Sequence, residues 1–190
     1  MKHIIYLAAG SSRRFGENKL LCELEGKPLY RHGLDMLSAL VSEKDDCGLT
    51  VVSCYPEIRD AARALGARAA DSPESKKGLS YTIRAGLDAV GTLGDGDFLL
   101  FVVADQPWLT AKTVSRLLGR AQPGVEAACA AYDGRMGNPM LFSAALAPEL
   151  WELTGDHGGR GVAHRHLCET VQVDDPRELC DVDAPEDMIP

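Results

Sequence analysis

Hydrophobic residues along this chain form short unbroken runs, separated by longer stretches in which they recur every three or four positions. The unbroken runs have the length and composition of buried strands. They lie at residues 3–7, 49–55 and 98–103. The periodic stretches predict helices with one apolar face. One of them opens at Pro28, and the others cover residues 56–65, 79–90 and 111–119. This alternation of strands and helices predicts a largely parallel sheet covered on both faces.

The alternation breaks in the C-terminal half. Two strands are predicted at about residues 126–132 and 139–142, joined by a polar turn at 133–135. A glycine-rich turn region at 155–161 then precedes a last strand at about 170–173. The hairpin predicts an antiparallel elaboration of the sheet. We therefore expect a single α/β domain over residues 1–190, with three Rossmann-like layers and a mostly parallel mixed sheet.

Composition and charge restrict the possible binding partners more than they restrict the possible folds. The chain has 190 residues, of which 45% are hydrophobic and 25% charged, as in an ordinary globular domain. A net charge of −8 argues against nucleic-acid and membrane partners, because nothing would offset phosphate repulsion globally. No apolar run reaches transmembrane length or suits a secretion signal, so we expect a cytoplasmic protein. Six cysteines show no metal-ligand spacing, and we expect Cys54 and Cys129 to be buried thiols.

The loop after the first strand is the most informative segment for chemistry. Gly10 and Gly16 allow a tight turn and close approach to a ligand, while Arg14 and Lys19 bring positive charge. A strand that leads into uncovered backbone amides and two cations indicates a cradle for phosphate. The spacing is neither that of a Walker A loop nor G-x-G-x-x-G. A plain glycine and serine turn with two surface arginines is the alternative.

Residues 7–19, LAAGSSRRFGENK, resemble the signature L-A-(A/G)-G-x-S-x-R-(M)-G-x-x-K of the MobA-like nucleotidyltransferases, with Phe15 in place of Met. Among them the segment is most similar to the MocA-type molybdenum cofactor cytidylyltransferases. The resemblance implies a GT-A-like fold and catalytic roles for Arg14 and Lys19. It also implies nucleotide contacts from Leu7, Ala8, Ala9, Gly10, Ser11, Ser12, Arg14 and Lys19. Ala9 favours CTP, because the guanylyltransferases of the family tend to carry glycine there.

An aspartate follows the most apolar strand. Asp105 stands in the segment Ala104-Asp105-Gln106-Pro107, where a carboxylate either caps the next helix or binds Mg²⁺. The segment resembles the family motif A-D-M-P, with Gln106 in place of Met, which implies that Asp105 is catalytic and carries the metal. Residues 180–187 resemble the family segment D-(I/V)-D-T-P-E-D. The resemblance implies that Asp183 is the second ligand of Mg²⁺, or of Mn²⁺ in its place. Asp181 as that ligand and a plain helix start at Asp183 both stay open.

Two further segments extend the resemblance to the base and the acceptor. Residues 77–87 are similar to the helix start G-(M/L)-x-x-S-(L/V)-R-x-G, which implies that Gly78, Ser80 and Thr82 lie beside the nucleotide base. Ser80 is alternatively only an N-cap. Residues 137–139 and 155–160 resemble the segments G-H-P and G-D-x-G-A-R on the acceptor side. The acceptor residues carried over are Asn138, Pro139, Asp156 and Arg160; we expect His157 to be a surface histidine.

The resemblance implies transfer of CMP from CTP to a phosphate on molybdenum-bound pterin, with release of pyrophosphate. Residues of about 1–108 would bind the nucleotide, and about 109–190 would bind the acceptor and complete the sheet. A client molybdenum enzyme is then a further expected partner. Two alternatives remain: a related nucleotidyltransferase that uses another phosphorylated small molecule or another NTP, and a non-catalytic accessory protein that binds nucleotide or cofactor for a molybdenum enzyme.

Overall fold

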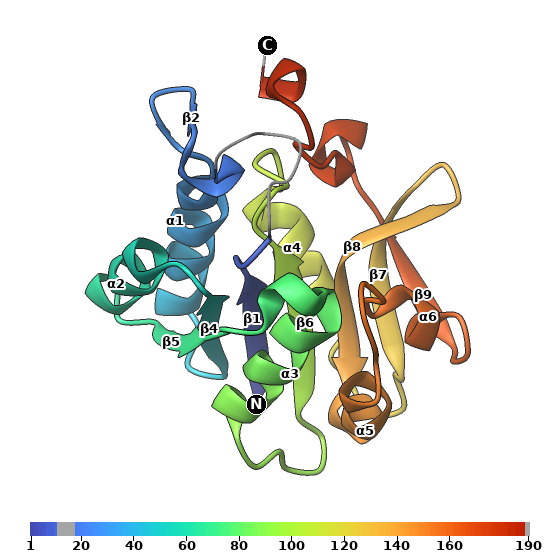
Figure 1. Cartoon of the computed structure of the whole chain (residues 1–190). Coiled ribbons are helices and arrows are strands. Elements are labelled where there is room, and N and C mark those ends of the chain that lie inside the picture. The colour runs from blue at the N-terminus through green and yellow to red at the C-terminus, as the bar shows by residue number, and fades with distance from the viewer. Residues whose placement is uncertain (11–17, 189–190) are drawn as a thin grey trace.

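A mixed β-sheet runs through the centre of the molecule (Figure 1). The computed structural model describes residues 1–10 and 18–188. Within these residues, seven strands pair in the order β5-β4-β1-β6-β8-β7-β9. Their bounds are β1 (Lys2–Leu7), β4 (Cys47–Ser53), β5 (Arg68–Asp71), β6 (Phe98–Val103), β7 (Ala127–Tyr132), β8 (Arg135–Ser143) and β9 (Cys168–Gln172). Only β8 runs antiparallel to its neighbours, so the predicted mostly parallel mixed sheet with a C-terminal antiparallel element is confirmed.

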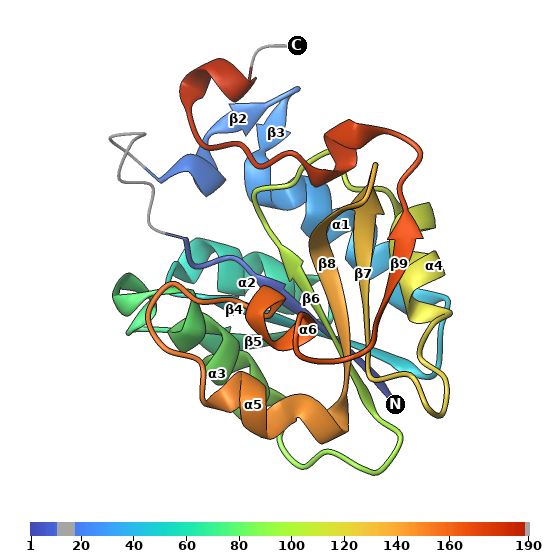
Figure 2. The same ribbon diagram turned by 90° about the vertical axis from the view of Figure 1, so that its right-hand side faces the viewer.

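Helices cover both faces of this sheet, which gives the predicted three layers (Figure 2). Their bounds are α1 (Leu29–Ser42), α2 (Pro56–Ala64), α3 (Leu79–Val90), α4 (Ala111–Leu118), α5 (Ala147–Trp151) and α6 (Arg160–Ala163). Apolar residues of α1, α2 and α4 pack with Ile4 and Tyr6 on one face. Those of α3, α5 and α6 pack with Ile5 and Leu7 on the other. Successive β1 side chains thus serve opposite cores, as the two-residue period of a strand requires.

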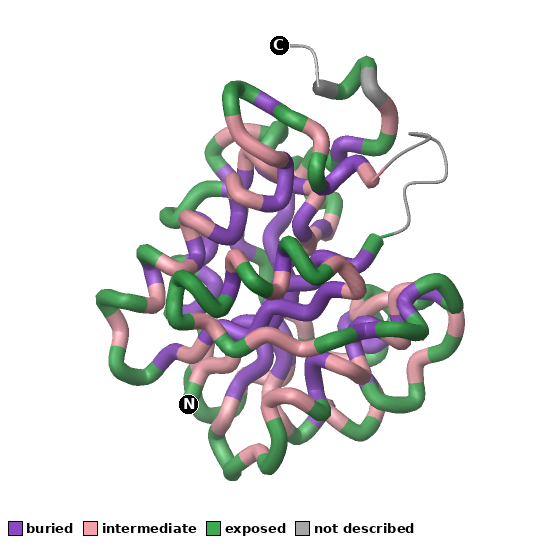
Figure 3. Tube along the Cα trace, turned by 60° about the vertical axis from the view of Figure 1, so that its left-hand side comes forward, coloured by how far each residue is buried: buried purple, intermediate pink, exposed green. Residues whose placement is uncertain are grey.

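Burial is deepest in the central strands, which Figure 3 shows as purple segments enclosed by pink and green ones. Cys129 on β7 is buried as predicted, whereas Cys54 lies just beyond β4 and is only half-buried. All six cysteines lie in the described part, and none of them forms a disulfide there. Among the residues that the structure describes, no helix is both long and apolar enough to cross a membrane.

Several short elements differ from the sequence prediction. Edge strand β5 and the two-stranded hairpin of β2 (Glu23–Leu24) and β3 (Lys27–Pro28) were not predicted, and neither was α5. These elements are too short to show a clear hydrophobic period. Helix α6 begins inside the predicted turn region 155–161, and β9 begins two residues earlier than expected. By contrast, α3 and β6 have the predicted bounds, and Thr110 caps α4 by accepting the Thr113 amide at 3.3 Å.

The carboxyl ends of β1 and β6 meet at one edge of the sheet. Leu7 pairs with Val103 of β6 and with Val52 of β4. The Ala104 amide donates to the Leu7 carbonyl at 3.1 Å, so the chain segments that follow β1 and β6 leave the sheet side by side. In open parallel sheets, ligands bind at this edge.

Candidate active site

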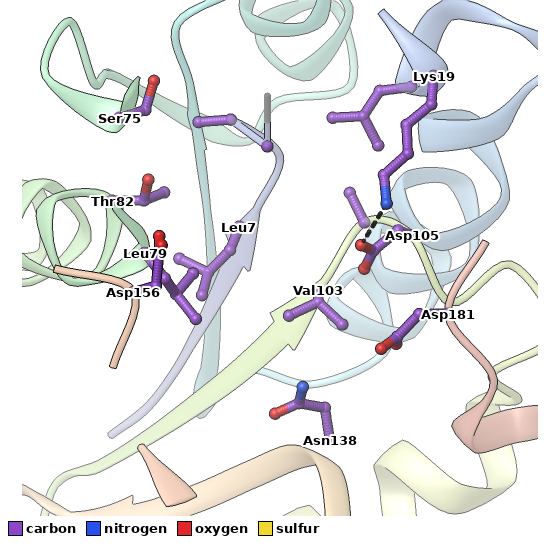
Figure 4. Close-up of a pocket in the computed structure, with 14 residues that line it drawn as sticks. Leu7, Lys19, Ser75, Leu79, Thr82, Val103, Asp105, Asn138, Asp156 and Asp181 are labelled. Carbon is purple, nitrogen blue, oxygen red and sulfur yellow. Dashed lines mark hydrogen bonds and ion pairs between the residues drawn. The ribbon is translucent and has the colours of Figure 1, made fainter. Parts of the chain in front are cut away.

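A cavity of about 350 Å³ opens where β1 and β6 end (Figure 4). Residues at the start of α3 and of the C-terminal segment line its two sides. Its lining comprises Leu7, Ala9, Gly10, Lys19, Leu20, Ser75, Leu79, Thr82, Val103, Ala104, Asp105, Asn138, Asp156 and Asp181. Most of the described residues that the sequence resemblance assigned to nucleotide, metal and acceptor therefore face one space, although they come from five separate segments.

The N-terminal wall consists of the backbone just after β1. The Ser53 hydroxyl donates to the Ala8 carbonyl at 2.6 Å, and the Tyr55 hydroxyl donates to the Gly10 carbonyl at 3.1 Å. Ala8 itself is buried in the core, while Ala9 and Gly10 line the cavity. Ser11, Ser12 and Arg14, which were assigned to the nucleotide, lie outside the described residues.

Lys19 joins this wall to the acidic side of the cavity. It opens a short 3₁₀ helix, Lys19–Leu21, whose N-cap Asn18 accepts the Leu20 amide at 3.1 Å. Its buried ammonium donates to Asp105 Oδ2 at 2.9 Å, to the Val182 carbonyl at 2.7 Å and to Asp183 Oδ1 at 3.1 Å. Burial alone lowers the pKa of Lys19, but the charge and hydrogen bonds of Asp105 and Asp183 outweigh it and raise that pKa above its ordinary value.

The C-terminal segment places two acids near Asp105, and they have different contacts. Asp181 lines the cavity, and its Oδ1 accepts the Gln106 amide at 2.9 Å. Burial, followed by the negative charge of Asp105, raises the pKa of Asp181. Asp183 lies outside the cavity lining and pairs with Lys19. The Asp187 carboxylate accepts hydrogen bonds from the backbone amides of Asp183 and Ala184, at 2.8 Å each.

The start of α3 forms the side of the cavity opposite the acids. Thr82, Leu79 and Ser75 line it, but Ser80 is fully buried inside the helix. The N-cap of α3 is Gly78 rather than Ser80. Gly78 has φ +130°, and a Cβ there would lie 2.2 Å from the carbonyl of Gly155. Because Gly78 has no side chain, the loop at residues 155–156 can pack closely against it, and this loop brings Asp156 to the cavity.

The residues assigned to the acceptor separate into two places. Asn138 and Asp156 line the cavity, while Pro139 is buried in β8. The register of β7 and β8 shifts at this point, because Cys129 pairs with Met140 and the next residue, Ala130, pairs with Gly137. The resulting bulge holds Asn138 and Pro139 out of the ladder and aims Asn138 at the cavity.

Arg160 is not part of this cavity. Its guanidinium donates to the Met136 carbonyl at 3.0 Å and lines a neighbouring hollow of about 560 Å³ with Arg135 and His164. His157 is exposed, as expected, and its ring nitrogen Nδ1 lies 2.9 Å from the Thr154 carbonyl oxygen. The structure therefore does not place Arg160 in one cavity with Asn138 and Asp156, as the resemblance implied.

Oxygen ligands suited to a divalent ion meet at the acidic side. In the described ranges, no group of three or more His, Cys, Asp or Glu side chains is arranged to hold a metal ion by itself. Magnesium, however, takes one or two carboxylates and completes its shell with water and substrate phosphates. Asp105 together with one acid from residues 181–183 satisfies that requirement. The residues present therefore fit Mg²⁺ or Mn²⁺.

Sequence reasoning did not assign Ser75 and Leu79, which line the cavity, or Gln106, which donates a hydrogen bond to Asp181. Ser75 and Leu79 flank Gly78, so the glycine-marked helix start was the available signal. Gln106 is 4% exposed. In the sequence it stands out only because the motif A-D-M-P has Met at this position. A polar amide directly after a strand and a candidate metal ligand was the available signal, because a buried polar side chain needs a hydrogen-bond partner.

Comparison with known proteins shows the family to which the chain belongs. Residues 4–171 match the family described as the MobA-like NTP transferase domain. The chain belongs to this family. The expected nucleotidyltransferase activity is thereby confirmed at the level of enzyme class, whereas the MocA-type cytidylyl branch is not distinguished.

Relatives in the family span nearly the whole chain. Purine catabolism protein PucB of Bacillus subtilis is 26% identical over 96% of this chain and 92% of its own length. The molybdenum cofactor guanylyltransferase of Shewanella woodyi is 29% identical over 96% of this chain and 91% of its own. The crystal structure of Rv0371c from Mycobacterium tuberculosis in complex with manganese is 25% identical, with a TM-score of 0.72, and the alignment covers 98% of this chain and 95% of that one. The α/β nucleotidyltransferase fold is thus shared.

Proposed function

We propose that this nucleotidyltransferase transfers CMP from CTP to a phosphate on molybdenum-bound pterin and releases pyrophosphate. One observation carries the proposal. Lys19 and Asp105 are 86 residues apart in the sequence, yet their side chains meet at 2.9 Å in the cavity that Ala9 and Gly10 also line. A cation, a carboxylate and backbone of the glycine loop around one cavity form a site for a metal–triphosphate.

For the proposed reaction the protein has to align the two substrates and neutralise their charge, and it does not have to supply a nucleophile. A phosphate acceptor is already an anionic nucleophile at neutral pH, so it needs no general base. Lys19 neutralises triphosphate charge, and Asp105 with an acid of residues 181–183 holds the divalent ion, Mg²⁺ or Mn²⁺. When bound, that ion supplies positive charge to the α-phosphate and the incoming oxygen.

In this proposal the base lies against the start of α3, and residues of the C-terminal half bind the acceptor. Thr82, with Gly78 and Ser80 behind it, supports the base, and the methyl group of Ala9 favours CTP over GTP. Asn138, Pro139 and Asp156 lie on the acceptor side, with Arg160 in the adjoining hollow. Residues of about 1–108 thus serve the nucleotide and residues of about 109–190 the acceptor. A molybdenum enzyme is the proposed recipient of the product.

A pyrophosphate-release assay with each of the four NTPs and several phosphorylated acceptors tests the proposal. We expect the highest rate with CTP and molybdenum-bound pterin. The Asp105→Asn variant should lose at least about 100-fold in kcat, because an electrostatic contribution to the transition state is removed. Its circular dichroism spectrum should be unchanged.

The other outcomes of the assay are equally informative. Tight nucleotide binding without pyrophosphate release from any NTP would indicate a non-catalytic accessory protein. Higher rates with a sugar phosphate, alditol phosphate or phospholactate would assign the acceptor to another class. Near-wild-type turnover of Asp105→Asn with Mg²⁺ would exclude the proposed role of Asp105.

A further inference from the structure

A second hollow, of about 560 Å³, adjoins the cavity along strand β8. Residues of the β7–β8 hairpin, of helix α6 and of the 3₁₀ helix Pro176–Leu179 contribute to its lining. Gly137 lines this hollow, and the next residue, Asn138, lines the cavity. Figure 1 shows the hairpin, in orange and yellow, projecting beyond the rest of the sheet. The hollow is therefore a surface of its own, and apart from Arg160 the proposed reaction leaves it without a role.

The side chains around this hollow are of the types that gather where proteins bind one another. Tyr132, Met136, Arg135 and Arg160 line it. Aromatic residues, Met and Arg are enriched in interfaces between proteins, whereas Lys, Glu, Asp, Ser and Ala are depleted there. Of the residues that the structure describes, none of these five depleted types lines the hollow. Its composition therefore indicates a surface that a partner protein covers.

The charge of the hollow has the opposite sign to that of the whole chain. The chain has a net charge of −8, yet two arginines and no described acid line the hollow, and Asp133 at the hairpin tip lies outside the lining. Arginines on α1, α2 and α4 form ion pairs with acids. Arg160 instead donates to the Met136 carbonyl at 3.0 Å, and within the described ranges neither Arg160 nor Arg135 pairs with a carboxylate. These two cations favour a partner that brings negative charge.

The openness of the hollow favours a protein segment over other anions. A site for a small molecule encloses most of the ligand's surface, whereas Tyr132, Arg135 and Arg160 are all exposed. A nucleic acid would extend past the hollow, where the net negative charge of the chain repels its phosphates. A short acidic protein segment brings its charge only to the two arginines.

We propose that this hollow docks a partner protein through a short acidic segment that carries one apolar or aromatic side chain. The carboxylates of the segment pair with Arg135 and Arg160, and its apolar side chain packs against Tyr132 and Met136. Tyr and Arg are the residue types that most often dominate the binding energy of an interface. The inference goes beyond the proposed reaction and does not depend on it.

The experiment selects binders from a phage-displayed library of random peptides on the immobilised full chain. The peptide that binds best is synthesised with a fluorescent label, and its Kd is measured by fluorescence anisotropy. We expect the selected peptides to combine Asp or Glu with an aromatic residue or Leu. Tyr132→Ala, Arg135→Gln and Arg160→Gln should each raise Kd by at least about tenfold, and added salt should weaken binding to the wild type. Circular dichroism checks the folding of each variant; if Tyr132→Ala does not fold, the two arginine variants decide.

Arg84→Gln is the matched control. The Arg84 guanidinium also donates to a backbone carbonyl, that of Leu153 at 3.2 Å, and packs on an aromatic ring, 4.4 Å from the centroid of Tyr81. It lies outside the hollow. Its Kd for the peptide should stay within about threefold of the wild type, since a residue outside the contact surface contributes little.

Several results would overturn the inference. Selected peptides without acids, or equal Kd values for the wild type and Arg135→Gln, would show that the hollow is not a docking site for an acidic segment. A labelled oligothymidylate that displaces the peptide and binds more tightly would assign the hollow to nucleic acid. A wild-type dimer in sedimentation that Arg135→Gln dissociates would assign it to a second copy of the chain.

The pyrophosphate assay separates this inference from the proposed function. Arg135 does not line the cavity, so Arg135→Gln should release pyrophosphate at the wild-type rate while its Kd for the peptide rises. If no NTP yields pyrophosphate but the peptide pattern holds, the proposed function fails and the docking site stands.

Discussion

At the scale of single residues, Lys19 connects distant parts of the site. Its ammonium contacts Asp105 and Asp183, which are 86 and 164 positions away in the sequence. The same group is the proposed partner of the triphosphate. Lys19 therefore contributes to the stability of the ligand-free protein as well as to binding, and the two contributions can be measured separately.

Replacement of Lys19 by Met should destabilise the protein in EDTA by about 2 kcal/mol, less than a fully buried pair would cost, since Asp183 is more than half exposed. Because the folded pKa of Lys19 is raised, its contribution is complete below the ordinary lysine pKa of about 10.4 and is lost as pH rises through the higher folded value. The difference in Tm between wild type and variant should therefore be constant from about pH 7 to 10 and shrink above. Lys2→Met, which breaks the exposed Lys2–Asp46 pair, is the control and should change Tm little. An unchanged Tm of Lys19→Met would contradict this account.

Ala9 offers a test of base choice at the same scale. Ala9 lines the cavity, whereas neighbouring Ala8 packs in the hydrophobic core. We expect Ala9→Gly to raise kcat/KM for GTP relative to CTP by about 5- to 10-fold, since a methyl group in a pocket discriminates by roughly 1–3 kcal/mol at most. The measurement is pyrophosphate release with both nucleotides in competition. Ala8→Gly changes the backbone similarly without widening the cavity, so its CTP to GTP ratio should equal that of the wild type.

At the scale of elements, helix α3 connects the sheet to the side of the cavity that is proposed to hold the base. Glycines stand at both of its ends, Gly78 with φ +130° and Gly91 with φ +82°. Only Gly78 faces close neighbours, because nothing lies within 4 Å of a Cβ built at Gly91. The two positions share the need for positive φ and differ in packing against the 155–156 loop.

This pair separates backbone strain from packing. Gly91→Ala should cost about 1–3 kcal/mol through strain alone. Gly78→Ala should cost roughly 2–5 kcal/mol, since its Cβ also meets the Gly155 backbone, and it should raise KM because the loop that carries Asp156 is displaced. Urea unfolding and NTP-dependent kinetics measure the two effects. Equal free-energy losses at both positions would argue against the packing contribution.

At the scale of the whole molecule, the residues that line the cavity come from nearly the full length of the chain, from Leu7 to Asp181. Lys19 and the 181–183 segment close over the edge formed by β1 and β6. Ligand binding at this junction should therefore stabilise the folded protein as a unit. The backbone contact between the Val182 amide and the Asp105 carbonyl, 2.8 Å, joins the C-terminal segment to the sheet even without ligand.

Mn²⁺ with CTP at about 100 times its Kd should add about 2.7 kcal/mol, or a rise in Tm of about 5–10 °C. Thermal unfolding with Mn²⁺ alone, CTP alone and both together measures this coupling. EDTA should abolish the metal-dependent part, and Asp105→Asn should show none of it. A full shift in Asp105→Asn would place the ion elsewhere.

The elements that could be predicted are those with a strong local pattern. The apolar run at 98–103 and the periodic stretch at 79–90 became β6 and α3 with the predicted bounds. Strand β5, with the sequence RAAD, and the five-residue helix α5 carry too little periodicity to be recognised. Within the site, Lys19 and Asp105 were predicted because each follows a strand in a recognisable motif.

What the sequence by itself determined is the alternation of strands and helices, the two motifs at the strand ends and the family to which they belong. These follow from local burial patterns and local backbone chemistry, which a linear sequence records. Only the tertiary structure decided that Asp181 faces the cavity while Asp183 pairs with Lys19, that a bulge aims Asn138 inward and that Arg160 lies in a separate hollow. Those choices depend on side-chain contacts between distant segments, whose geometry is set by the packing of the whole sheet and not by any one stretch of residues.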